Sequence, residues 1–179
     1  MKKFGIVPDV IDQAPSEIVK IKYGDKSFEL GEELTPTDVK DLPTTVSFPS
    51  KEEDFHAICM VDPDAPSRSK PVYREWLHWL VVNIPGTDIS KGNTIAEYIG
   101  AGPPIDTGLH RYVFLVYKQP AELMCDEEKI SNTSTKDRVQ FEIRKFSRKY
   151  SLGVPIAGNF FLAQWDDYVP KLYKKLEYN

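Results

Sequence analysis

The sequence predicts a mainly β fold, a two-sheet, Greek-key-like antiparallel β-sandwich with peripheral helices, one of them at the C-terminus. Three observations predict it. Apolar and aromatic runs of strand length are separated by short loops that contain Pro, Gly and Asp. The 14 prolines are spread through the 179 residues, which is typical of a chain with many rigid turns. Helical spacing of apolar residues follows only after residue 134.

The expected strands come first along the chain. Residues 17–23 alternate so that Val19, Ile21 and Tyr23 share one face, and Gly24 then turns the chain toward a second short segment. The longer strands are expected at residues 55–61, 76–84 and 109–118. The first of these is apolar throughout and is expected to be buried on both sides, and the last is rich in aromatic and β-branched residues.

The first expected helix begins at a cap formed by Ser134 and Thr135 and ends before Gly153 and Pro155. Its apolar residues recur at helical spacing: Val139, Ile143, Phe146 and Tyr150. The basic run at 144–150 is interpreted as the solvated face of this helix, because charged residues cover the outer face of an amphipathic helix.

The second expected helix forms the tail of the chain. Asp166 and Asp167 can cap it, and Pro170 is tolerated because it falls in the first turn. The residues expected on its apolar face are Val169, Tyr173 and Leu176.

Composition limits the classes of function. With 41% hydrophobic and 28% charged residues, the chain suits one domain over residues 1–179, expected as a monomer. A net charge of −4 argues against a nucleic-acid partner. No apolar stretch has the roughly 18 residues of a membrane span, and the first residues lack the apolar run of a secretory signal. Cys59 and Cys125 cannot make a disulfide framework, which favours a cytoplasmic location.

Side-chain direction singles out two of the strands. Because residues i and i+2 of a strand point the same way, Trp76 and His78 are expected to share one face, with Leu77 and Trp79 on the other. By the same rule His110 and Tyr112 face together, and Arg111 turns away. Each of these two strands therefore presents an imidazole beside an aromatic ring.

Two loops are expected to complete a concave site around these histidines. Gly100 and Gly102 allow a ligand to approach the backbone closely, and their N–H groups can donate to an anion. Pro103, which is followed by a second proline, lacks an N–H donor and fixes the exit of this loop. The acidic stretch DPDAP, which begins at Asp62, would form one wall.

The expected ligand is a zwitterion. Imidazoles, backbone N–H groups and the Tyr112 hydroxyl suit a phosphate or carboxylate, whereas carboxylates beside them repel it. An ammonium group directed toward Asp62 or Asp64 resolves this conflict, and Trp76 can stack on a cation or an apolar stem. A phosphoethanolamine-like head group has both charges.

Other interpretations stay open at this point. A hydrolase could use His78 or His110 as a general base, although no Ser or Cys occupies a G-x-S-x-G elbow. A metal could be held by the same histidines with Asp62 or Asp64, although no close ligand spacing supports this. Each motif alone also suits a structural role, and His56 is assigned to structure.

The quoted motifs together resemble the phosphatidylethanolamine-binding protein family, also called the Raf kinase inhibitor protein family. The resemblance rests on "DPDAPSR", "YREWLHWLVVNIPG", "YIGAGPPIDTGLHRYVFLVYKQP" and "WDDYVPKLYKKL". By resemblance, the family's anion pocket falls on Asp62, Pro66, Tyr73, Trp76, His78, Gly100, Gly102, His110 and Tyr112. One departure concerns the rim, where Ile105 and Asp106 replace a Lys and a Gly that family members often have.

The resemblance implies a non-enzymatic binding protein for phospholipid head groups or other phosphate-bearing ligands, with no cofactor, no metal and no catalytic residue. It further implies a two-sheet fold, a C-terminal helix beside the pocket mouth and a cis peptide bond before Pro66. The resemblance also implies two kinds of interaction, with a protein kinase or protease as partner and with a membrane through peripheral contact.

Overall fold

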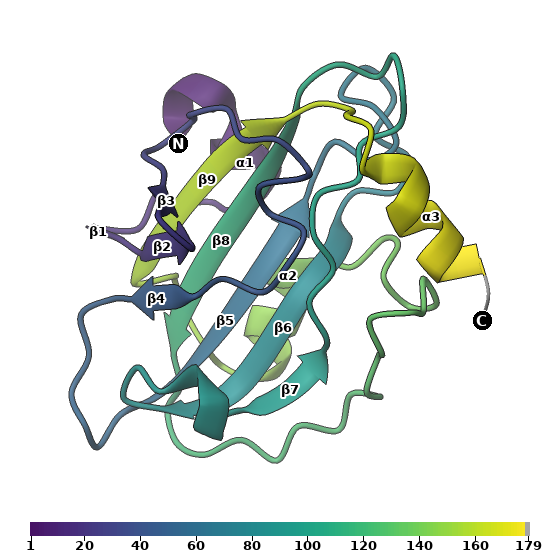
Figure 1. The fold of residues 1–179 in the computed structure, drawn as a ribbon. Coiled ribbons are helices and arrows are strands. Elements are labelled where there is room, and N and C mark those ends of the chain that lie inside the picture. The colour runs from purple at the N-terminus through teal and green to yellow at the C-terminus, as the bar shows by residue number, and fades with distance from the viewer. Residues whose placement is uncertain (178–179) are drawn as a thin grey trace.

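Two β-sheets lie face to face in the computed structural model, which describes residues 1–177 (Figure 1). The strands are β1 (Glu17–Ile18), β2 (Lys20–Tyr23), β3 (Lys26–Ser27), β4 (Thr45–Ser47), β5 (Phe55–Asp62), β6 (Trp76–Pro85), β7 (Asn93–Ala96), β8 (His110–Lys118) and β9 (Ala157–Ala163). The α-helices are α1 (Ile6–Asp9), α2 (Ile143–Lys149) and α3 (Val169–Glu177), and short 3-10 helices span Lys2–Phe4 and Ile89–Lys91. No helix of residues 1–177 combines the length and apolar character needed to cross a bilayer.

The larger sheet has the strand order β1-β9-β8-β5-β6-β7. Strands β5, β6 and β7 are consecutive antiparallel neighbours, and β8 returns to pair antiparallel with β5, which is a Greek-key order. Strand β9 is antiparallel to β8, and β1 is parallel to β9 at the edge. The predicted fold class is therefore confirmed, with one parallel pair in a sheet that is otherwise antiparallel.

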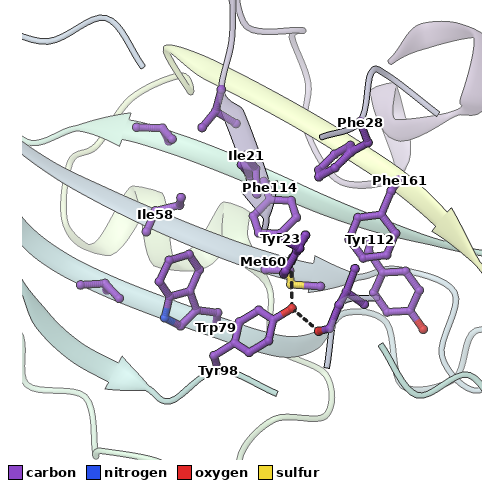
Figure 2. Packing of buried hydrophobic residues seen from close by; sticks show 14 of the residues in the cluster. Ile21, Tyr23, Phe28, Ile58, Met60, Trp79, Tyr98, Tyr112, Phe114 and Phe161 are labelled. Atoms are coloured by element: carbon purple, nitrogen blue, oxygen red, sulfur yellow. Dashed lines mark hydrogen bonds between the residues drawn. The ribbon is translucent and has the colours of Figure 1, made fainter. Parts of the chain in front are cut away.

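The smaller sheet, β3-β2-β4, covers one face of the larger sheet, and an aromatic core fills the space between them (Figure 1). Figure 2 shows this core, in which Tyr112, Phe114 and Phe161 of the larger sheet pack with Phe28. The alternation predicted for the first strands explains the inner face of the smaller sheet, because Ile21 and Tyr23 are both buried there while Lys20 and Lys22 are exposed.

Helices cover the opposite face of the larger sheet. Apolar residues of α1 and α2, such as Ile6 and Phe146, form a second core with Leu115 and other residues of the sheet. Strand β5 is consequently buried on both faces over nearly its whole length, as its continuous apolar run predicts.

The first predicted helix is much shorter than expected, because residues 134–142 are not helical. Helix α2 begins only at Ile143 and has no side-chain cap from its own N-terminal residue. The preceding backbone pairs instead with the start of β6: the N–H of Leu77 donates to Arg138 O (2.8 Å), and Glu75 and Phe141 exchange two bonds of 3.0 Å. Tertiary hydrogen bonds and the burial of Arg138 thus override the helical spacing in this segment.

Two further differences concern strands. Residues 17–23 divide between the sheets, since β1 pairs with β9 whereas β2 pairs with β3 and β4. Strand β9, which the sequence pattern did not predict, is fully integrated beside β8. It contains Gly158 and Asn159, two residue types that are depleted in strands, and this explains why its pattern is weak.

Helix α3 agrees with the prediction in its position and its cap. The carboxylate of Asp166 accepts the N–H of Tyr168 (2.9 Å), and Val169 is buried. The apolar face is centred on Val169 and Leu172, while Tyr173 is 36% exposed, so the predicted face is rotated slightly.

Candidate functional site

A cavity of about 340 Å³ opens beside α3, where the end of β5 meets the starts of β6 and β8. Its lining residues are Asp62, Ala65, Pro66, Tyr73, Trp76, His78, Ile99, Gly100, Gly102, Pro104, His110, Tyr112, Thr135, Leu172, Tyr173 and Leu176. Three separate parts of the chain therefore converge as the sequence predicted, and helix α3 adds a wall. The volume suits a small organic molecule.

Most of the residues predicted to bind a ligand line this cavity, with two exceptions. Pro103 is buried outside the lining, and Pro104 takes its place. Asp64 is fully buried and makes a two-pronged ion pair with Arg111, with distances of 2.8 and 2.6 Å. The structure therefore does not place Asp64 where an ammonium group could reach it, and Asp62 is left as the acidic residue of the lining. The Ala65–Pro66 peptide bond is cis.

His78 is aimed into the cavity by a β-bulge. Met60 pairs with Trp79 and Val61 with Leu77, so His78 is an extra residue on β6. Because of this bulge, Leu77 and Trp79 lie in the cores on opposite sides of the sheet. The prediction that these two side chains share a face is therefore wrong, whereas Trp76 and His78 do lie together, with ring centroids 4.4 Å apart.

The His78 ring is held in one neutral form. Its Nδ1–H donates to the carbonyl oxygen of Ile99 at 2.8 Å, which leaves Nε2 as an acceptor. Burial lowers the pKa of His78 to about 3, because the charged ring would lose its hydration. His78 therefore offers an acceptor to a ligand, rather than the donor that the sequence interpretation assumed.

His110 belongs to a hydrogen-bonded chain. Its Nδ1 lies 2.8 Å from Asp62 Oδ2, and its Nε2 lies 2.9 Å from the Thr107 hydroxyl. That hydroxyl donates its proton to Pro104 O (2.7 Å), so Nε2 of His110 must be the N–H donor to Thr107. Burial raises the pKa of Asp62, and the bond to His110 opposes this shift. One proton therefore lies between Asp62 and His110.

Tyr112 has a buried hydroxyl with no hydrogen-bond partner in the described structure. The ring is fixed by stacking on Phe161, with centroids 5.0 Å apart, and by an edge contact with His78 at 5.2 Å. Burial raises the pKa of Tyr112, so the hydroxyl keeps its proton and remains a donor. A buried donor without an acceptor is costly, which makes this atom a natural contact for a ligand oxygen.

Helix α3 supplies lining residues that were not among the predicted site residues, namely Leu172, Tyr173 and Leu176. The Tyr173 hydroxyl donates to Gly102 O at 2.7 Å and thereby ties the helix to the loop that contains Gly100 and Gly102, the glycine loop. The amphipathic pattern of the tail was the signal that could have found them, since it already placed Tyr173 and Leu176 on one face. Ile105, the residue in which the rim departs from the family pattern, lies outside the lining and is 60% exposed.

The alternative chemistries find little geometric support. Asp62, His110 and Thr107 follow one another as in a hydrolase triad, but Thr107 is not in the cavity lining and its proton is directed at Pro104 O. Among residues 1–177, no group of three or more His, Cys, Asp or Glu side chains is arranged to hold a metal ion.

Comparisons with known proteins agree with this geometry. The family model for phosphatidylethanolamine-binding protein matches residues 24–161. The putative odorant-binding protein A5 of Drosophila melanogaster is 44% identical over 177 residues, which are 98% of this chain and 84% of that protein. The solution structure of a protein designated CG7054 is 49% identical, with a TM-score of 0.77 over 96% of this chain and 97% of that one. Carboxypeptidase Y inhibitor, solved in complex with its cognate proteinase, is 26% identical, with a TM-score of 0.78 over 92% and 93%.

Proposed function

The chain belongs to the phosphatidylethanolamine-binding protein family, and from this premise we propose that it is a binding protein without enzymatic activity whose cavity takes a small phosphate-bearing ligand. The unpartnered hydroxyl of Tyr112 carries the proposal. A phosphoryl oxygen is an acceptor that satisfies this buried donor. The neutral acceptor Nε2 of His78 lies on the adjacent ring and suits a second, donor-bearing group such as P–OH.

The remaining lining refines the expected ligand. Asp62 is the acidic residue of the lining, and its carboxyl oxygens are acceptors toward which an ammonium group on the same ligand can be directed. Leu172 and Leu176 of α3, with Ile99 and Ala65, offer apolar surface on which a short hydrocarbon stem can pack. A phosphoethanolamine head group with a short apolar stem matches both features.

Protein partners are a separate part of the proposal. Carboxypeptidase Y inhibitor shares this fold and was solved with a proteinase, so a protease is the first candidate partner to test. Inhibition of carboxypeptidase Y by the purified protein is the direct assay, and lack of inhibition at micromolar protein would remove this candidate. The predicted kinase partner, peripheral membrane contact and cytoplasmic location stay predictions from the sequence.

The binding proposal is tested with Tyr112→Phe, which removes one hydroxyl and no ring atom. We expect this variant to bind O-phosphorylethanolamine about tenfold or more weakly, because a buried hydrogen bond to a charged group contributes roughly 1.5–3 kcal/mol. Calorimetry or NMR titration measures the affinity. Tyr117→Phe is the matched control, because Tyr117 is buried on the same strand but packs in the core on the other face of the sheet.

Equal affinities of the two variants for O-phosphorylethanolamine would contradict the proposed site. So would NMR shifts in the unmodified protein that avoid Trp76, His78, Gly102 and His110. Comparing O-phosphorylethanolamine with methyl phosphate and with ethanolamine separates the contribution of the phosphate from that of the ammonium group. Turnover of a phosphate ester that depends on His110 would replace the binding proposal with the hydrolase alternative.

A further inference from the structure

Arg138 is a fully buried cation directly behind the cavity. All its donor nitrogens point at backbone carbonyl oxygens. These are Ser134 O (2.8 Å), Leu77 O (2.9 Å), His78 O (3.3 Å), Glu97 O (2.8 Å) and Ser131 O (2.9 Å). The side chain therefore ties the loop before α2 to β6 and to Glu97, the residue after β7, which gives it a structural role.

The positive charge of Arg138 has no matching carboxylate. No Asp or Glu oxygen in the described chain lies within ion-pair distance of its guanidinium, whereas Arg111, the other buried arginine, is paired with Asp64 and Asp9. Burial lowers the pKa of Arg138 to about 10, so the group is still charged at neutral pH. Burying a cation without a counter-ion is unfavourable even when its N–H groups are hydrogen-bonded. Neutral N–H donors could hold the same carbonyl oxygens, so these hydrogen bonds do not by themselves explain why a charged side chain is buried here.

The charge lies directly behind two residues of the cavity wall. The guanidinium carbon is 5.5 Å from the centroid of the Trp76 ring, and one guanidinium nitrogen contacts the carbonyl oxygen of His78. Trp76 and His78 both line the cavity. The lining itself contains the neutral His78 and the Asp62–His110 pair, which shares one proton and so has no net charge, and it therefore offers an incoming anion no net positive charge.

We propose that Arg138 is the counter-charge of the bound anion and sets the preference of the cavity for charged over neutral phosphoryl groups. This inference rests on the proposed function and deepens it. The cation acts through the wall formed by Trp76 and His78, so it is a positioning and selectivity residue that does not touch the ligand. One charge separated from the ligand by this wall is expected to change the affinity for an anion by about an order of magnitude.

The test compares two phosphoryl ligands that differ in charge, methyl phosphate and the larger, uncharged trimethyl phosphate. In Arg138→Met we expect the affinity for methyl phosphate to fall about tenfold and that for trimethyl phosphate to change less than about twofold. Arg138→Lys keeps the charge but not the fork of donors, and we expect it to retain the preference for methyl phosphate. Equal losses for both ligands in Arg138→Met would overturn the inference and leave a purely structural role.

A second variant keeps the inference testable if Arg138→Met does not fold. Glu97 is an exposed acid whose negative charge partly offsets that of Arg138, and its carboxylate accepts the N–H of Asn132 at 2.8 Å. Glu97→Gln keeps an acceptor but removes the charge. We expect about twofold tighter binding of methyl phosphate at low salt and a smaller gain at high salt. Unchanged binding in Glu97→Gln would count against the inference.

The two proposals fail in different ways. If the unmodified protein does not bind methyl phosphate at all, the proposed anion site is wrong. If it binds methyl phosphate normally but loses both ligands equally in Arg138→Met, only the role of Arg138 is wrong.

Discussion

Burial controls the protonation of single residues around the cavity and on the adjacent stretch of β6. It keeps His78 neutral, it raises the pKa of Asp62, and it leaves the Tyr112 hydroxyl as a donor without a partner. Glu75, the residue before β6, is affected most clearly, because burial raises its pKa from 4.5 to about 7. Its carboxylate accepts the N–H of Ile143 at 3.0 Å and thereby caps α2 from another part of the chain.

The raised pKa of Glu75 predicts a pH dependence of stability. The folded protein holds the Glu75 proton more tightly than the unfolded chain does, so its stabilising contribution is complete below pH 4.5 and is lost as the pH rises through about 7. Glu75→Gln cannot ionise but keeps an acceptor for Ile143. We expect the stability of the unmodified protein relative to this variant to fall by roughly 3 kcal/mol between pH 4.5 and pH 8.

Urea unfolding of both proteins at several pH values measures this difference. Glu142→Gln is a suitable control, because Glu142 is an exposed acid beside the same helix and its carboxylate pairs with Lys145. A difference between the unmodified protein and Glu75→Gln that stays constant with pH would show that Glu75 titrates normally.

At the scale of elements, the glycine loop is held between two neighbours of unequal stiffness. A Cβ on Gly100 would lie 2.4 Å from Val39 O, which is a backbone atom of the segment before β4. A Cβ on Gly102 would lie 2.8 Å from Leu172 Cδ2, which is the end of a flexible side chain on α3. The cavity therefore has one wall fixed by backbone contact and one wall that can adjust.

This difference predicts unequal costs for two similar substitutions. We expect Gly100→Ala to reduce the free energy of unfolding by about 2–3 kcal/mol, because backbone atoms must move to accept the methyl group. Gly102→Ala should cost less than about 1 kcal/mol and should shift the NMR signals of Leu172 and Tyr173. Thermal unfolding of both variants provides the measurement. Equal losses of stability in the two variants would show that the two walls of the cavity do not differ in stiffness.

At the scale of the whole molecule, the two sheets are joined by a hydrogen-bonded chain as well as by the aromatic core. The Tyr23 hydroxyl of the smaller sheet bonds to the Tyr98 hydroxyl (2.8 Å), which in turn donates to Val39 O at 2.8 Å (Figure 2). Trp79 of β6 packs against Tyr98 with ring centroids 5.9 Å apart. Loss of the smaller sheet would therefore expose groups of the larger sheet, so we expect the two to unfold together.

Substitution of the two tyrosines tests this coupling. Tyr98→Phe leaves Tyr23 and Val39 O without a partner and should cost about 2 kcal/mol, whereas Tyr23→Phe leaves the bond to Val39 intact and should cost about 1 kcal/mol. The double variant should cost little more than Tyr98→Phe alone. Tryptophan fluorescence and far-UV circular dichroism should give one midpoint in each variant, and separate midpoints would show that the sheets unfold independently.

The sequence by itself determined the features that depend on local periodicity. Strands β5, β6 and β8, the position of α3 and the direction of Arg111, away from His110 and Tyr112, all follow from the alternation or spacing of neighbouring residues. The acidic, glycine and histidine motifs also identified Asp62, Trp76, His78, Gly100, Gly102, His110 and Tyr112 of the cavity lining, and the family resemblance added Pro66 and Tyr73.

Tertiary structure decided the features in which distant groups compete with local preference. The bulge at His78 is invisible in the sequence because it depends on pairing with β5, and it moved Trp79 to the other face. Residues 134–142 are not helical because their backbone pairs with the start of β6 around Arg138. The Asp64 carboxylate does not line the cavity because it pairs with Arg111. In each case the cause is the same: a buried polar group must find a partner, and the partner lies far away along the chain.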